Sequence, residues 1–127
     1  MRILILEDNA ERIAQFVDNY FPENIHFVRT ADRAIELLKL NPKFDVVFLD
    51  HDLGGQEMLE AGAAGTGSDV ARYIAEELGP IIFPGVVVLH SINPKGRQWM
   101  LEILADNLGA ARVTDFPFAW QKCVIAK

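Results

Sequence analysis

The chain alternates between short, wholly apolar runs and longer stretches that carry apolar residues at helical spacing. The apolar runs have the length of strands, and their lack of polar residues is typical of strands covered on both faces. Strict alternation of such strands with amphipathic helices predicts a parallel sheet. The expected strands are 2–6, 24–29, 44–49, 85–90 and 111–116.

The expected helices begin at polar capping residues. Asn9 and Thr30 precede two of them, and their side chains suit the free N–H groups of a first helical turn. Asn93 precedes Pro94, and proline is tolerated at the first helical position. The expected helices are 9–20, the segment after Thr30, about 68–78 and the segment from Pro94, and the tail 119–127 fits a helix or a strand, of which we favour the helix.

These units predict one α/β domain over residues 1–127, with a doubly wound five-stranded parallel sheet and helices on both faces. In this architecture ligands bind outside the carboxyl ends of the strands, at the topological switch point. The polar residues expected at that edge are Glu7, Asp8, Asp50, His51, Asp52, His90, Ser91 and Asn93.

Composition and charge limit the partners and the cellular compartment that we expect for the protein. A formal charge of -6 without clustered basic residues argues against nonspecific nucleic-acid binding. The single Cys123 cannot form an internal disulfide, which favours a reducing compartment. The apolar run near the N-terminus is too short for a signal peptide, and no stretch reaches the roughly 20 apolar residues of a membrane helix. We therefore expect a cytoplasmic protein with no membrane contact.

Two motifs resemble the receiver domain of two-component response regulators, and the likeness spans nearly the whole chain. They are ILILEDN at 3–9 and FDVVFLDHDLGG at 44–55. The resemblance implies a flavodoxin-like sheet of order 2-1-3-4-5, a metal-binding acidic pair at Glu7 and Asp8, and a phospho-acceptor at Asp50.

The chain departs from the receiver pattern at two places. His90 stands where receivers carry Thr or Ser, although Ser91 could substitute, and Phe116 stands where they carry Lys. An apolar ring cannot neutralise a phosphoryl oxygen. The segments LDHDLGG, GTGSDVA and LHSINPKG are closer to a receiver-like family described as cyclic-phosphate-processing, which keeps the acidic pocket, lacks the lysine and adds histidines. This likeness implies a functional set of Asp50, His51, Asp52, Thr66, Asp69, His90, Ser91 and Asn93.

The acidic residues at the sheet edge predict a metal site. Carboxylates of Glu7, Asp8 and Asp50 would repel one another unless a divalent cation lies between them. Oxygen ligands suit Mg²⁺ or Mn²⁺. The alternative is that Glu7 points to solvent and Asp8 caps the first helix.

The histidines at the same edge suggest acid–base chemistry. Imidazole titrates near neutral pH, so His51 and His90, with Asp52 beside them, are candidate catalytic residues for ester cleavage. In the alternative, His51 is exposed in a loop and His90 bonds the backbone at a strand end.

Four further polar residues are candidate phosphate or substrate ligands: Thr66, Asp69, Ser91 and Asn93. Capping is the simpler role for Thr66 and Asn93, since each precedes an expected helix. Asp69 would also be favoured near a helix N-terminus without any ligand.

The leading functional hypothesis is binding or hydrolysis of a small phosphate-containing ligand, a cyclic phosphate or nucleotide, by a metal-dependent phosphoesterase. The alternative is a divergent response regulator that a histidine kinase phosphorylates on Asp50. A third possibility is an adaptor without catalysis. The long connection 50–67, rich in Gly and Ala, fits a lid over the site or a partner-binding loop.

Overall fold

The computed structural model describes residues 2–9, 11, 25–53, 58–91 and 93–115. They form a five-stranded parallel sheet of order β2-β1-β3-β4-β5, which confirms the predicted fold class and order. The strands are β1 (Ile3–Leu6), β2 (Ile25–Val28), β3 (Val46–Leu49), β4 (Val86–Leu89) and β5 (Val113–Asp115).

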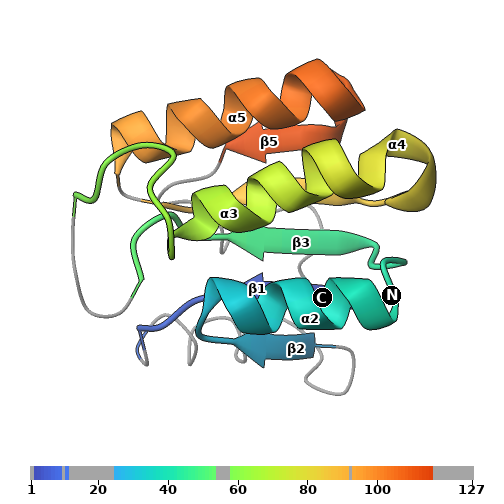
Figure 1. Cartoon of the computed structure of the whole chain (residues 1–127), viewed down its shortest axis with the longest axis horizontal. Coiled ribbons are helices and arrows are strands. Elements are labelled where there is room, and N and C mark those ends of the chain that lie inside the picture. The colour runs from blue at the N-terminus through green and yellow to red at the C-terminus, as the bar shows by residue number, and fades with distance from the viewer. Residues whose placement is uncertain (1, 10, 12–24, 54–57, 92, 116–127) are drawn as a thin grey trace.

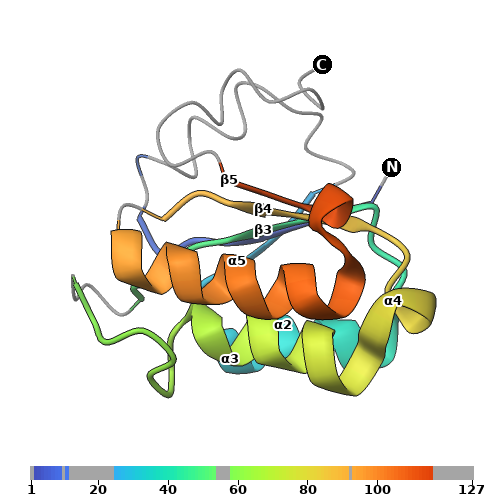
Figure 2. The same ribbon diagram turned by 90° about the horizontal axis from the view of Figure 1, so that it is seen from above.

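The described helices α2, α3 and α5 cover one face of this sheet (Figures 1 and 2). Most of the helix expected at 9–20, and all of the tail 119–127, lie outside the described residues. None of the described helices has the length and apolar character needed to cross a membrane. The helical segments are α2 (Ala31–Leu40), α3 (Gly67–Arg72), a π-helical segment (Tyr73–Leu78), α4 (Gly79–Ile82), α5 (Pro94–Leu108) and a 3-10 turn (Ala110–Arg112).

The last strand is shorter than predicted. Residues 111–112 belong to the 3-10 turn, and β5 begins only at Val113. The Arg112 guanidinium donates hydrogen bonds to the backbone carbonyls of Pro80, Phe83 and Gly85. These bonds hold the turn against the segment before β4. Such a long-range contact cannot be predicted from the local sequence.

Apolar side chains fill both faces of the sheet. Leu6 and Leu49 lie in the cluster on the side of the helices, whereas Ile5 and Phe48 lie in a second buried cluster on the opposite face. Successive side chains of a strand point to opposite faces. The side chains of the residues that directly follow β1, β3 and β4 therefore start on the face of Ile5 and Phe48, away from the described helices.

Three predicted helix caps are confirmed. The side chains of Thr30, Thr66 and Asn93 accept hydrogen bonds from backbone N–H groups in the first turns of α2, α3 and α5, respectively. Each bond satisfies a donor that has no partner within its helix. These caps fix where each helix starts after the loop at the carboxyl edge of the sheet.

Thr30→Ala should lower the free energy of unfolding by about 1 kcal/mol, because the bond from the Arg33 N–H to Thr30 Oγ1 (3.2 Å) is lost. Urea denaturation measures the change. Thr30→Ser keeps the hydroxyl and should stay near the parent protein. Equal losses in both variants would show that the cap does not stabilise α2.

Candidate functional site

Glu7, Asp50 and His90 form a row across three neighbouring strands at the carboxyl edge of the sheet. The backbone ladder continues one residue past the strand ends: the Asp50 N–H donates to the Leu6 carbonyl (3.3 Å), and the His90 N–H donates to the Leu49 carbonyl (3.1 Å). The row crosses the boundary between β1 and β3, where the strand order reverses. Adjacent strands lie about 4.8 Å apart, so side chains in such a row meet.

These three side chains could hold a metal ion. One ligand atom from each lies within 4.8 Å of the others, and all three residues are buried. His90 Nε2 lies 3.1 Å from Glu7 Oε1, a distance that suits both a hydrogen bond and two ligands of one ion. Carboxylate and imidazole groups both bind divalent cations. The donor set therefore fits a metal centre.

The composition of this group differs from the predicted acidic triad in one member. His90 joins Glu7 and Asp50, whereas Asp8 is only half-buried and lies outside the group. The Asp8 backbone carbonyl accepts a hydrogen bond from Arg29 (3.4 Å). A ligand role for Asp8 remains a prediction.

A second buried cluster joins His51, Asp52 and Asn93. His51 Nδ1 lies 2.8 Å from Asp52 Oδ1, and Asn93 Nδ2 donates to the same oxygen (3.0 Å). The backbone N–H groups of Met58 (2.7 Å) and Leu59 (3.2 Å) also donate to the Asp52 carboxylate. Asp52 thus ties the end of β3 to the following loop and to the first turn of α5.

These contacts lower the pKa of Asp52. Burial by itself raises the pKa of Asp52, but hydrogen bonds from Asn93, His51 and the Met58 N–H outweigh it and hold the pKa below its ordinary value. The carboxylate is therefore ionised at neutral pH, and because an ionised carboxylate only accepts, His51 Nδ1 donates the bond between them. His51 Nε2 is buried and has no hydrogen-bond partner among the described residues.

Gly96 in the first turn of α5 lies against the His51 ring. A Cβ atom at this position would lie 2.3 Å from His51 Cγ and 2.5 Å from Nδ1. Only a glycine lets the helix pass this close to the imidazole. Sequence reasoning missed this role, although the glycine lies within the LHSINPKG segment.

Asp52→Asn should lower the free energy of unfolding by about 2 kcal/mol at neutral pH. The amide would place its N–H₂ group, a donor, opposite N–H groups that donate hydrogen bonds to the carboxylate of the parent protein. A carboxylate with a lowered folded-state pKa stabilises the protein above its unfolded pKa, ordinarily 3.8, and loses that contribution as the pH falls through the folded value. The difference in the free energy of unfolding between the parent protein and Asp52→Asn should therefore become smaller in acid.

Urea denaturation at neutral pH and below about pH 3 measures this difference. Asp106→Asn, an exposed change near the end of α5, serves as the control and should show little difference at either pH. A difference of the same size at both pH values would contradict a lowered pKa of Asp52 in the folded protein.

The remaining candidate ligands have structural partners. Thr66 Oγ1 donates to the Ala63 carbonyl (2.6 Å) in addition to capping α3, and Ser91 Oγ accepts from the Asn93 N–H (3.1 Å). Asp69 accepts from the Gly65 N–H (2.7 Å). Direct phosphate contact by these residues remains a prediction.

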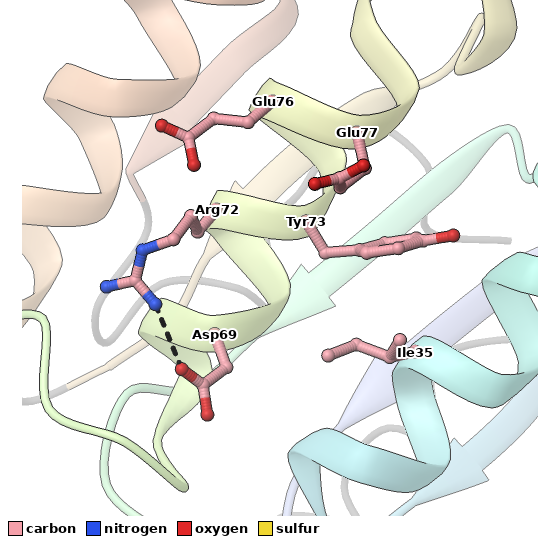
Figure 3. Close-up of a pocket in the computed structure, with 6 residues that line it drawn as sticks. All are labelled: Ile35, Asp69, Arg72, Tyr73, Glu76 and Glu77. Carbon is pink, nitrogen blue, oxygen red and sulfur yellow. Dashed lines mark hydrogen bonds and ion pairs between the residues drawn. The ribbon is translucent and has the colours of Figure 1, made fainter.

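Asp69 also pairs with Arg72 (3.0 Å) and lines a cavity of about 250 Å³ between α2 and α3 (Figure 3). None of the residues that line this cavity belongs to the metal group or to the cluster around Asp52. Of the predicted site residues, Asp69 contacts Thr66, whose backbone carbonyl accepts a hydrogen bond from the Asp69 N–H (3.1 Å).

A larger cavity, of about 350 Å³, lies at the carboxyl edge of the sheet. The loop before α3 and the first turn of α5 lie at this edge, on the left of Figure 1. Asn93 is shared between the cavity wall and the cluster around Asp52. The lining residues are Met58, Leu59, Glu60, Ala61, Asn93, Pro94 and Lys95.

The two candidate histidines belong to different clusters. His90 lies in the metal group, and its ring centroid is 6.2 Å from that of Phe48 on the sheet face away from the described helices. His51 faces Gly96 of α5. His51 is fully buried, so the alternative of an exposed loop histidine is wrong.

A family model described as "Cyclic-phosphate processing Receiver domain" matches residues 2–106, most of the chain. The chain therefore belongs to this family. No curated protein matches the chain.

Proposed function

We propose that this cyclic-phosphate processing receiver domain binds a cyclic phosphate beside a divalent metal ion and hydrolyses it. The observation that carries the proposal is the buried row of Glu7, Asp50 and His90. Asp50 directly precedes the hydrogen-bonded pair of His51 and Asp52. The family description supports the class of substrate.

The ligand set favours Mn²⁺ over Mg²⁺. Mg²⁺ prefers oxygen ligands alone, whereas a site with an imidazole suits softer ions, and Mn²⁺ accepts both donor types. A bound ion would lower the pKa of a water molecule and offset phosphate charge. The chain would contribute Glu7 and Asp50 as oxygen ligands and His90 as a nitrogen ligand.

His51 is the proposed proton carrier. Hydrolysis of a cyclic phosphodiester adds water across one P–O bond: the water oxygen joins phosphorus, and the released ring oxygen takes up a proton. Because His51 Nε2 is buried, the attacking water would have to enter beside it; Nε2 would then accept the proton of that water and return it to the ring oxygen. Asp52 would hold the ring orientation and stabilise the imidazolium that forms between these steps.

Turnover of a panel of cyclic phosphates in the presence of Mn²⁺ tests this function. His51→Gln should lower kcat at least about 100-fold, whereas His26→Gln, an exposed change on β2, should leave it near the parent value. A folded, Mn²⁺-loaded protein that hydrolyses none of the panel would contradict hydrolysis. Incorporation of phosphate at Asp50 from acetyl phosphate would then support the response-regulator alternative.

A further inference from the structure

We propose that the cavity at the carboxyl edge is a specificity pocket, and that it holds the nucleobase of a nucleoside cyclic phosphate. For convenience we call it the edge pocket; it is lined by Met58–Ala61 and Asn93–Lys95. The inference rests on the proposed function, because it names the organic part of the same ligand.

Both walls of the edge pocket are hydrogen-bonded to Asp52, the partner of the proposed proton carrier His51. One wall is tied to the Asp52 carboxylate by the Met58 and Leu59 N–H groups. The opposite wall is tied to the same carboxylate by Asn93 Nδ2, which also donates to the Leu59 carbonyl (2.7 Å). The residue that orients His51 therefore also sets the distance between the two walls.

The edge pocket and the metal group are connected through neighbouring residues of the chain. Asp50 and Asp52 are two residues apart, so their backbones are separated by at most about 7 Å. This is less than the length of a nucleotide. A phosphate bound beside Asp50 would leave its attached sugar and base near the wall that Asp52 holds.

Met58 shows strain where the edge pocket is formed. It has φ +53°, the single positive φ of a non-glycine residue in the described part of the chain. Such a conformation is unfavourable for a residue with a side chain, and it persists when the surroundings enforce it. The Met58 N–H donates a 2.7 Å hydrogen bond to Asp52 in this conformation, and Met58 is 60% exposed.

The chemistry of the lining matches a nucleobase. Met58, Leu59, Ala61 and Pro94 offer apolar surface for the face of a planar ring, and thioether–ring contacts are favourable. Glu60 and Lys95 are exposed on the same lining and supply one acceptor and one donor group.

Nucleobase edges carry both donors and acceptors, whereas a bare polyol carries no flat apolar face. The volume of about 350 Å³ lies near the lower limit of small-molecule pockets, roughly 300–1,000 Å³. Such a volume suits a single base and its sugar.

The test compares two ligands that share the phosphate and differ in the base. With the Mn²⁺-loaded parent protein, adenosine cyclic phosphate should have a kcat/KM at least about tenfold above that of glycerol cyclic phosphate. Met58→Ser and Lys95→Gln should each lower kcat/KM for the adenosine compound several-fold and leave the value for the glycerol compound unchanged.

Matched controls lie far from the edge pocket. Ile81→Ser removes a 92% exposed apolar side chain from α4, and Lys39→Gln removes a lysine from the last turn of α2. Neither should change the ratio between the two ligands.

The outcomes separate the two proposals. Equal kcat/KM for both ligands, or unchanged ratios in the Met58 and Lys95 variants, would overturn the nucleobase pocket and leave the phosphoesterase standing. Absence of turnover for both ligands would overturn the proposed function, and the pocket proposal with it.

Discussion

Gly67→Ala is expected to lower the free energy of unfolding by at least about 3 kcal/mol, the upper end of the usual range for overpacked sites. A Cβ atom on Gly67 would lie 1.9 Å from the Asp50 carbonyl oxygen and 2.8 Å from its carbon. These are backbone atoms at the end of β3, so no rotation of a side chain relieves the clash. The Gly67 N–H also donates to the His51 carbonyl (2.9 Å), which keeps α3 from moving away.

Urea denaturation of Gly65→Ala provides the comparison in the same loop. A Cβ at Gly65 meets no atom within 4 Å, and the cost there comes from φ +78° alone. A left-handed conformation costs an alanine about 1–2 kcal/mol. A Gly67 variant no less stable than the Gly65 variant would show that the approach of α3 to Asp50 is not required.

Gly96→Ala is expected to lower kcat for cyclic phosphate hydrolysis about 100-fold, because it displaces the His51 ring. The new Cβ would lie 2.3 Å from His51 Cγ, so the ring must shift by roughly 1 Å to reach ordinary contact. Alanine favours a helix by about 1 kcal/mol relative to glycine, but overpacking costs about 1–3 kcal/mol, so the protein should also lose some stability.

Gln98→Ala, an exposed change in the same helix, is the control for Gly96→Ala. It should leave kcat and the free energy of unfolding near the parent values. The imidazole resonances of His51 in an NMR spectrum give a readout that is independent of turnover. They should move in the Gly96 variant and stay in place in the Gln98 variant. A Gly96 variant with parental kcat and an unmoved His51 signal would contradict the positioning role.

The fold was predictable because its signals are local. Strand length, apolar content and the alternation with helices determine a parallel sheet, and capping residues such as Thr30 and Asn93 mark helix starts. The switch-point rule brought Glu7, Asp50 and His90 to one edge. Those parts of the site follow from strand order alone.

The details of the site depend on register and on contacts between distant segments. His90 joins Glu7 and Asp50 because the three residues share a row, and a row is a property of paired strands rather than of any one segment. The contact of Gly96 with His51 depends on how α5 crosses the sheet edge. The residue pattern within one strand or helix does not predict such contacts.

The direct measurement of the central claim is a calorimetric titration of the protein with Mn²⁺. The parent chain should bind one equivalent, and His90→Gln should weaken the affinity by at least about 100-fold, since even residues outside the first set of ligands change metal affinity by 10- to 100-fold. Asp106→Asn, exposed on α5, should bind as the parent does. A parent protein that binds no Mn²⁺, or a His90 variant with parental affinity, would contradict a metal centre at Glu7, Asp50 and His90.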